Sequence, residues 1–265
     1  MASVRPPAVA GSFYPADSRE LRDTVADLLA DADAGAEASG GSPKALVAPH
    51  AGYVYSGPVA ASAYARLRGR REAVTTVVLL GPAHRVWFEG LALPSCDALA
   101  TPLGLVRVRP DARQALADLP QVQVLDAAYA GEHSLEVHLP FLQVALGAFE
   151  VVPLIVGEAT PAQVAEVIDR LWGGPETLVV VSSDLSHYLD YASARRADAR
   201  TTRAIEQARF EELGEGSACG RVPLSGLLLA ARRRGLAVKT LDVRNSGDTA
   251  GPRDSVVGYG AWALH

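Results

Sequence analysis

Short apolar runs alternate with amphipathic segments along most of the chain. Several of the runs are rich in β-branched residues and have no polar face, which is typical of strands that helices cover on both sides. Between them, apolar residues recur every three or four positions, as they do on one face of a helix. The alternation predicts an α/β fold with a mixed, largely parallel central sheet flanked by helices.

The same pattern gives bounds for the elements. Strands are predicted at 45–48, 75–80, 91–93, 105–109, 122–125, 149–156, 178–181, 237–243 and 256–263. Helices are predicted at 18–33, 57–68, 111–119, 134–146, 161–172, 193–209 and 224–234. Ser18 and Thr160 are the expected N-caps of two helices. Gly35 is expected to end the first helix, before a polar loop at 36–43.

Length and composition fit one globular domain. The chain has 265 residues, of which 49% are hydrophobic, and chains of this order bury roughly 70–75% of their unfolded surface. No internal repeat, low-complexity tract or linker interrupts the pattern. A single domain over 1–265 is therefore the simplest interpretation.

Charge and cysteine content exclude several classes of protein. The net charge is -5 and the longest basic run is 232–234. The chain therefore lacks the positive surface charge that attracts nucleic acid. No apolar stretch approaches about 18 residues and the start has no signal-peptide core, which argues against a membrane segment or secretion. Two cysteines, Cys96 and Cys219, are too few for a disulfide framework. We expect a soluble protein of the reducing cytoplasm.

Three histidines close predicted strands at turns rich in glycine, proline or serine. These are His50, His84 and His187. Ligands of open α/β sheets bind just beyond the carboxyl ends of the strands, so the three side chains are predicted to converge. The alternative is that each histidine satisfies a hydrogen bond in its own loop.

Cys219 lies immediately before a predicted apolar helix, in the segment Ser-Ala-Cys-Gly-Arg. The helix N-terminus and Arg221 are expected to lower the pKa of its thiol and favour the thiolate. A thiolate beside two imidazoles would suit iron, copper or zinc. The alternative is a small buried apolar side chain, the structural role we expect for Cys96.

Two further segments combine acid and base groups. His133 and His138 lie five residues apart at a predicted helix start, so at most one of them faces a common site, and His133 is the better candidate. Asp184 and His187 follow a strand with a spacing of three. They are interpreted either as a carboxylate–imidazole pair for acid–base chemistry or as a turn with an Asp cap.

Motifs of several other enzyme classes are missing from the sequence. It has no GxxxxGK phosphate loop, no GxGxxG fingerprint, no GxSxG elbow and no CxxC pair. Nucleotide-binding and serine-hydrolase functions are therefore disfavoured.

Six local motifs, in order, resemble the Memo family over about 4–263. They are VRPPAVAGSFYP at 4–15, APHAGYVYSG at 48–57, GPAH at 81–84, EHSLEVHLPF at 132–141, SSDLSH at 182–187 and CGR at 219–221. The resemblance extends to protein B of the AmmeMemoRadiSam system. The family is similar in structure to class III extradiol ring-cleaving dioxygenases, so the resemblance implies that fold.

The resemblance also implies roles for particular residues. His50, His84 and Cys219 would be the metal ligands, with cysteine where the dioxygenases have glutamate. His187 resembles the acid–base histidine, Asp184 a polar neighbour lining the pocket, and His133 an additional active-site histidine. One departure is Val222, because some family members carry a histidine before the following proline.

Three functions are consistent with these features. The first is a metal-dependent oxidoreductase with iron or, alternatively, copper, using dioxygen on a small aromatic or amino-acid-derived substrate. The second is a non-catalytic adaptor that binds a peptide or metal, as described for eukaryotic members. The third is a zinc hydrolase. The resemblance implies radical S-adenosylmethionine and AMMECR1-type proteins as neighbours in bacteria.

Overall fold

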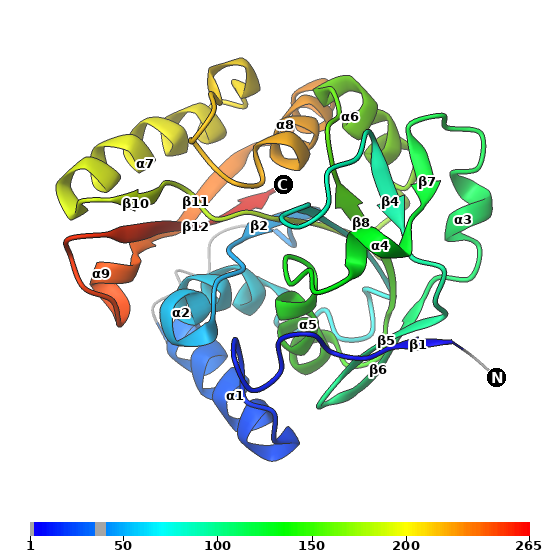
Figure 1. Cartoon of the computed structure of the whole chain (residues 1–265), viewed down its shortest axis with the longest axis horizontal. Helices are drawn as coiled ribbons and strands as arrows, with labels where there is room; N and C mark the ends of the chain where they lie inside the picture. Colours follow the sequence, from blue (N-terminus) through cyan, green and yellow to red (C-terminus); the bar gives the residue numbers. More distant parts are fainter. Residues whose placement is uncertain (1–2, 35–40) are drawn as a thin grey trace.

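A twelve-stranded mixed sheet organises the described residues, 3–34 and 41–265, of the computed structural model (Figure 1). Its main path runs β1-β5-β6-β8-β3-β9-β2-β12-β10. The strands are β1 Val4–Arg5, β2 Ala45–Ala48, β3 Thr76–Pro82, β4 Leu91–Leu93, β5 Ala98–Thr101, β6 Gly104–Val108, β7 Val122–Val124, β8 Glu150–Val156, β9 Thr177–Ser182, β10 His187–Leu189, β11 Val238–Asn245 and β12 Val256–Leu264. The protein is a single α/β domain, as the alternation predicts.

The central strands are parallel and the last ones are antiparallel. Strands β6, β8, β3, β9 and β2 pair in parallel, whereas β12 pairs antiparallel with β2, β10 and β11. Every residue of β2, β3 and β9 is buried. Their apolar sequences therefore match a position covered on both faces.

Helices cover both faces of this sheet. They are α1 Ser18–Ala34, α2 Tyr53–Tyr64, α3 Ala112–Ala115, α4 Asp126–Tyr129, α5 Leu139–Leu146, α6 Pro161–Arg170, α7 Tyr191–Glu206, α8 Arg221–Arg234 and α9 Ser246–Thr249. Figure 1 shows α1, α2 and α5 on one face and α6 and α8 on the other. Alternate residues of β2 enter the two cores: Leu46 packs with the first group and Val47 with the second.

Helix starts account for most differences from the predicted bounds. The helix predicted from 57 begins four residues earlier, at Tyr53, so Gly57 lies within the helix rather than at its start. A Cβ on Gly57 would lie 3.0 Å from Leu28 Cδ1, so the glycine lets α1 and α2 approach closely. In the helix predicted at 134–146, the first turn is a 3-10 helix, Glu136–His138, and α5 follows it.

Caps explain two further starts. Asp17, rather than Ser18, caps α1, because its Oδ1 accepts from the backbone N–H groups of Arg19 and Glu20. Thr160 caps α6 with a capping box, which confirms the prediction. The predicted end at Gly35 and the loop residues 36–40 lie outside the described residues.

The prediction covers only some of the short elements. The helix predicted at 111–119 is reduced to Ala112–Ala115. Strands β1, β5 and β10 and helices α4 and α9 are not predicted, whereas the equally short strands β2, β4 and β7 are. At two to four residues, periodicity alone does not separate a strand or helix from a loop.

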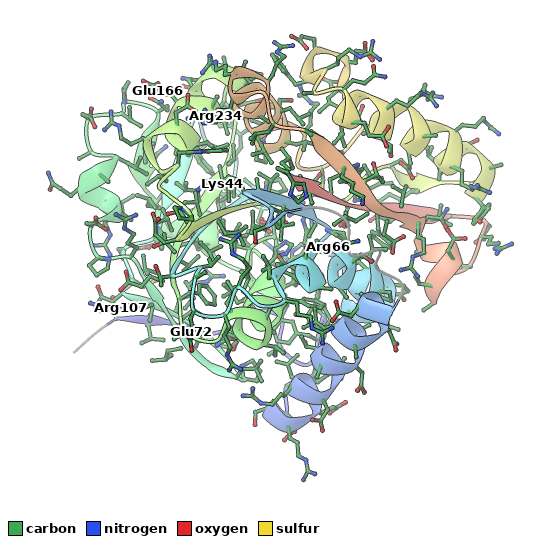
Figure 2. All side chains as sticks on the ribbon, turned by 180° about the vertical axis from the view of Figure 1, so that it is seen from behind. Lys44, Arg66, Glu72, Arg107, Glu166 and Arg234 are labelled. Atoms are coloured by element: carbon green, nitrogen blue, oxygen red, sulfur yellow. The ribbon has the colours of Figure 1, made fainter. Side chains whose placement is uncertain are left out.

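The amino end of the sheet is closed by polar contacts. Lys44, just before β2, donates from Nζ to the carbonyl oxygens of Trp172, Gly174 and Thr177 (Figure 2). Since His50 follows the other end of β2, Lys44 lies at the opposite end of the strand from the histidines. No helix in residues 3–34 or 41–265 has the length and apolarity that crossing a bilayer requires.

Candidate metal centre

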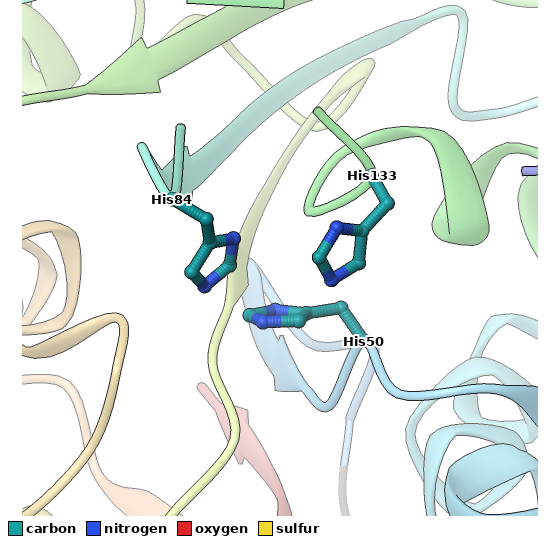
Figure 3. A group of neighbouring side chains, drawn as sticks. All are labelled: His50, His84 and His133. Atoms are coloured by element: carbon teal, nitrogen blue, oxygen red, sulfur yellow. The ribbon is translucent and has the colours of Figure 1, made fainter. Parts of the chain in front are cut away.

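Three histidines meet at the carboxyl edge of the parallel strands, two of them directly after a strand. His50 follows β2 and His84 follows β3, while β9 lies between these two strands. His133 comes from the loop before the 3-10 helix Glu136–His138. One ligand atom from each of the three lies within 4.8 Å of the others, and Figure 3 shows the rings facing a common space. The predicted convergence of His50 and His84 is thus present, whereas His187, the third histidine predicted to converge, is not in this group and His133 is.

The His50 ring is fixed by a neutral hydrogen-bond network. Ser182 Oγ donates to the carbonyl oxygen of Ser134 at 2.6 Å and lies 2.6 Å from His50 Nδ1. Because the hydroxyl proton is used, His50 Nδ1–H must be the donor to Ser182. Its Nε2 therefore carries the lone pair on the side of the cluster. Burial, together with the nearby His84 and His133, lowers the pKa of His50 and keeps it neutral.

His138 lies behind His50 in the same network. Its Nε2 lies 2.8 Å from Ser182 Oγ, and Tyr64 Oη lies 2.7 Å from its Nδ1. Burial lowers the pKa of His138 to about 3, so the ring is neutral and donates to Ser182. This position agrees with the expectation that only one of His133 and His138 faces the site.

Glu132 fixes the other two rings. Its carboxylate accepts from the backbone N–H groups of His84, His133 and Ser134. Its Oε1 also lies 3.0 Å from His84 Nδ1, which leaves His84 Nε2 free. Burial opposes ionisation of Glu132, but the bond and charge of His84 and the backbone donors outweigh it and hold its pKa at about 2.

His133 is the third imidazole of the cluster. Its Nδ1 makes no hydrogen bond within the described part of the chain, but it lies 3.5 Å from Glu132 Oε1. Its ring stacks on that of His84, with centroids 5.0 Å apart. Burial lowers the pKa of His133, which favours the neutral ring that a metal needs. Because Nδ1 lies next to Glu132, Nε2 is the nitrogen of His133 that would bind a metal.

Cys219 adjoins the cluster on the side of His50. Its Sγ lies 3.4 Å from His50 Nε2 and accepts from the backbone N–H of Asp184 at 3.2 Å. Gly220 permits this approach, since a Cβ there would lie 2.4 Å from the carbonyl oxygen of Ser182. The predicted lowering of the thiol pKa is wrong for the metal-free chain. Burial and the charge of Asp184 raise it to about 12.

Asp184 and His187 each bond elsewhere. Asp184 Oδ1 accepts from the backbone N–H of His50 at 2.8 Å, and its Oδ2 lies 3.9 Å from His50 Nε2. Burial raises the pKa of Asp184. The hydrogen bond of His187 Nδ1 is with the carbonyl oxygen of Leu185 at 2.8 Å. That carbonyl orients the ring of His187 and leaves its Nε2 as the proton acceptor.

Glu132 and Ser182 are the residues of the candidate site that the sequence analysis did not single out. Glu132 directly precedes His133, and Ser182 opens the segment that contains Asp184 and His187. The signal in the sequence that could have identified them is an acid or hydroxyl side chain within the same motif as a candidate histidine. Their partners lie 48 and 132 residues away in sequence, which no local pattern reveals.

A cleft of about 390 Å³ opens beside the cluster. His84 and Cys219 line it together with Trp87, Val222 and Pro223. The indole of Trp87 is 76% exposed. The cleft gives a small molecule access to two of the candidate ligands. Cys96, by contrast, is buried in the hydrophobic core, as expected.

Comparison with known proteins shows which family the chain is related to. The family model described as "Memo-like protein" matches residues 5–263. The chain belongs to the Memo family. It is 36% identical to a MEMO1 family protein of Aquifex aeolicus, with 97% of each chain covered, and 36% identical to one of Methanopyrus kandleri, again with 97% of each covered.

A solved structure supports the fold of this Memo family chain. An uncharacterized protein from Escherichia coli K12 matches with a TM-score of 0.53 and 15% identity, over 82% of this chain and 98% of that one. At that identity the likeness concerns the fold alone.

Proposed function

We propose that this Memo family protein is a metal-dependent oxidoreductase of the dioxygenase-like type. Iron in the ferrous state is the proposed metal, with copper as the alternative. The observation that carries the proposal is the group of three converging imidazoles, in which the hydrogen bonds of Nδ1 leave Nε2 of His50 and of His84 on the side of the cluster. Neutral imidazoles with oriented partners are metal ligands of the kind that non-haem centres use.

His50, His84 and His133 would hold the metal, with Cys219 beside them as a further or alternative ligand. Bound there, the metal would supply redox chemistry and a positive charge for a chelating substrate and dioxygen. Glu132 would raise the basicity of His84 through the bond to Nδ1. A thiol next to the centre would lose its proton on coordination.

Substrate would enter through the cleft at Trp87. His187 Nε2 would accept a proton from it, because Nδ1 is committed to the Leu185 carbonyl oxygen. The cleft volume of about 390 Å³ suits a small aromatic or amino-acid-derived molecule. The net charge of -5 gives nucleic acid no general attraction.

The test is metal content after anaerobic purification, for the parent and for His50→Ala, His133→Ala and Cys219→Ser. We expect about one equivalent of iron or copper in the parent. Loss in both histidine variants would establish the three-histidine centre, and the result for Cys219→Ser decides whether sulfur is a ligand. His187→Ala is the matched control, because it should keep the metal and lose turnover.

Absence of metal, even after reconstitution with ferrous, cuprous and zinc ions, would overturn the proposal in favour of a binding adaptor. A specific observation also favours a second candidate. Three imidazoles within reach of one ion are also a ligand set for zinc, which would leave one position for water. A zinc-loaded, colourless protein with esterase or amidase turnover would indicate that hydrolase.

A further inference from the structure

Tyr188 occupies a strained position at the edge of the sheet. In the pairing of β10 with β12, His187 lies opposite Val257 and Leu189 opposite Val256, so Tyr188 is the extra residue of a bulge. Its φ is +59°, in the left-handed region that favours glycine. A bulky residue there is energetically unfavourable.

The other described non-glycine residue with positive φ has an ordinary explanation. Ala208 ends α7, and the hydrogen bond from Arg209 N to the carbonyl oxygen of Ala204 is typical of a left-handed helix end. Tyr188 ends no helix. Glycine would satisfy its backbone equally well, so the tyrosine side chain needs a separate explanation.

Packing does not provide that explanation. Tyr188 is 78% exposed, so its ring gains little from burial. The ring does lie against that of His187, with centroids 5.7 Å apart and planes at 70°. Tyr188 follows His187 directly, and Asp184, three residues before His187, accepts from the backbone N–H of His50 at 2.8 Å. The ring therefore stands on the Asp184 and His187 side of the site.

We propose that Tyr188 is a substrate-positioning residue, whose ring the bulge holds at the rim of the site to contact a planar ring of the ligand. This inference rests on the proposed function, because it needs a ligand at the histidine cluster. Strained backbone at such a place is commonly retained where it serves binding. The exposed face of the ring would be covered only when the ligand is present.

Two small chelators separate the ring contact from metal binding. Catechol and glycolate each offer two oxygens to a metal, but only catechol has a ring. Their dissociation constants are measured anaerobically by calorimetry on the ferrous full-length protein. The variants are Tyr188→Gly and Tyr188→Phe, with Ala208→Gly as the matched control that relieves the same backbone strain without removing a ring.

We expect Tyr188→Gly to weaken catechol binding by about 3–10-fold, the range of an aromatic pair. Glycolate binding should stay within about twofold, and Tyr188→Phe and Ala208→Gly should bind both probes like the parent. Both glycine variants should have a melting temperature equal to or above that of the parent.

Three results would overturn the inference. One is unchanged catechol binding in Tyr188→Gly. Another is a fall in its melting temperature of more than about 4 °C, which would make the ring a structural element. The third is selective loss of catechol in Trp87→Ala alone, which would place the ring of the probe in the cleft instead. If the ferrous parent binds neither probe, the proposed function itself fails and the inference falls with it.

Discussion

The His84 side and the His50 side of the centre orient their imidazoles in opposite ways. On the His84 side, Glu132 is an ionised acceptor with a pKa of about 2, and it serves four N–H groups. On the His50 side, the acceptor is the neutral hydroxyl of Ser182, backed by the neutral ring of His138. Both arrangements leave Nε2 as the unprotonated nitrogen of a neutral ring, but only on the His84 side does a carboxylate bond the imidazole Nδ1 directly.

The difference shows how burial and donors together decide charge. Glu132 and Asp184 are both buried, yet the pKa of Glu132 is lowered whereas that of Asp184 is raised. Backbone N–H groups converge on Glu132, but one backbone N–H reaches Asp184 Oδ1. Where donors are few, desolvation prevails.

The largest effect is expected from Glu132→Gln. Three of the four N–H groups bond Oε1 and the backbone N–H of His84 bonds Oε2, so an amide would place an NH2 group against at least one of these donors and would remove the negative charge. We expect a loss of about 2–4 kcal/mol in the free energy of unfolding and a 10–100-fold loss of metal affinity. Urea denaturation and metal titration measure these changes. Asp184→Asn is the control, since its amide oxygen still accepts from His50 N, and equal losses in both variants would contradict the comparison.

An intermediate effect is expected from Ser182→Ala. His50 Nδ1 and His138 Nε2 would both lose their acceptor while remaining buried, at a cost of about 1–3 kcal/mol. Urea denaturation of the metal-free protein gives the value. Ser62→Ala removes a half-buried hydroxyl that donates to Pro58 O and Asp242, and it should cost less than about 1 kcal/mol. If Ser182→Ala lowers the free energy of unfolding no more than Ser62→Ala does, then Ser182 does not hold the two histidines in place.

The smallest effect is a pH dependence from His138. Its pKa is about 3 in the folded protein against 6.5 as its ordinary value. The unfolded chain therefore binds more protons between these values, and stability falls as pH falls through this window. The contribution is about 1 kcal/mol between pH 7 and pH 5.5. His138→Gln should remove it, as urea denaturation at the two pH values would show, whereas an unchanged difference would mean that other buried histidines account for it.

The sequence by itself determined the architecture. The apolar runs within β2, β3 and β9 have no polar face, and every residue of these strands is buried, as expected of strands that helices cover on both sides. Placing His50 and His84 after such strands was sufficient to predict that they meet, because parallel neighbours end at the same edge.

Only the tertiary structure decided how the site is held and charged. The sequence could not show that a ligand atom of His133 lies within 4.8 Å of those of His50 and His84. It also could not show that hydrogen bonds to Glu132 and Ser182 fix the tautomers of His84 and His50. It also led to the wrong direction for the pKa of Cys219, because a helix start is visible in sequence whereas burial beside Asp184 is not. Periodicity reports local geometry, but hydrogen bonds across 48 and 132 residues and the loss of solvent arise only when distant segments pack.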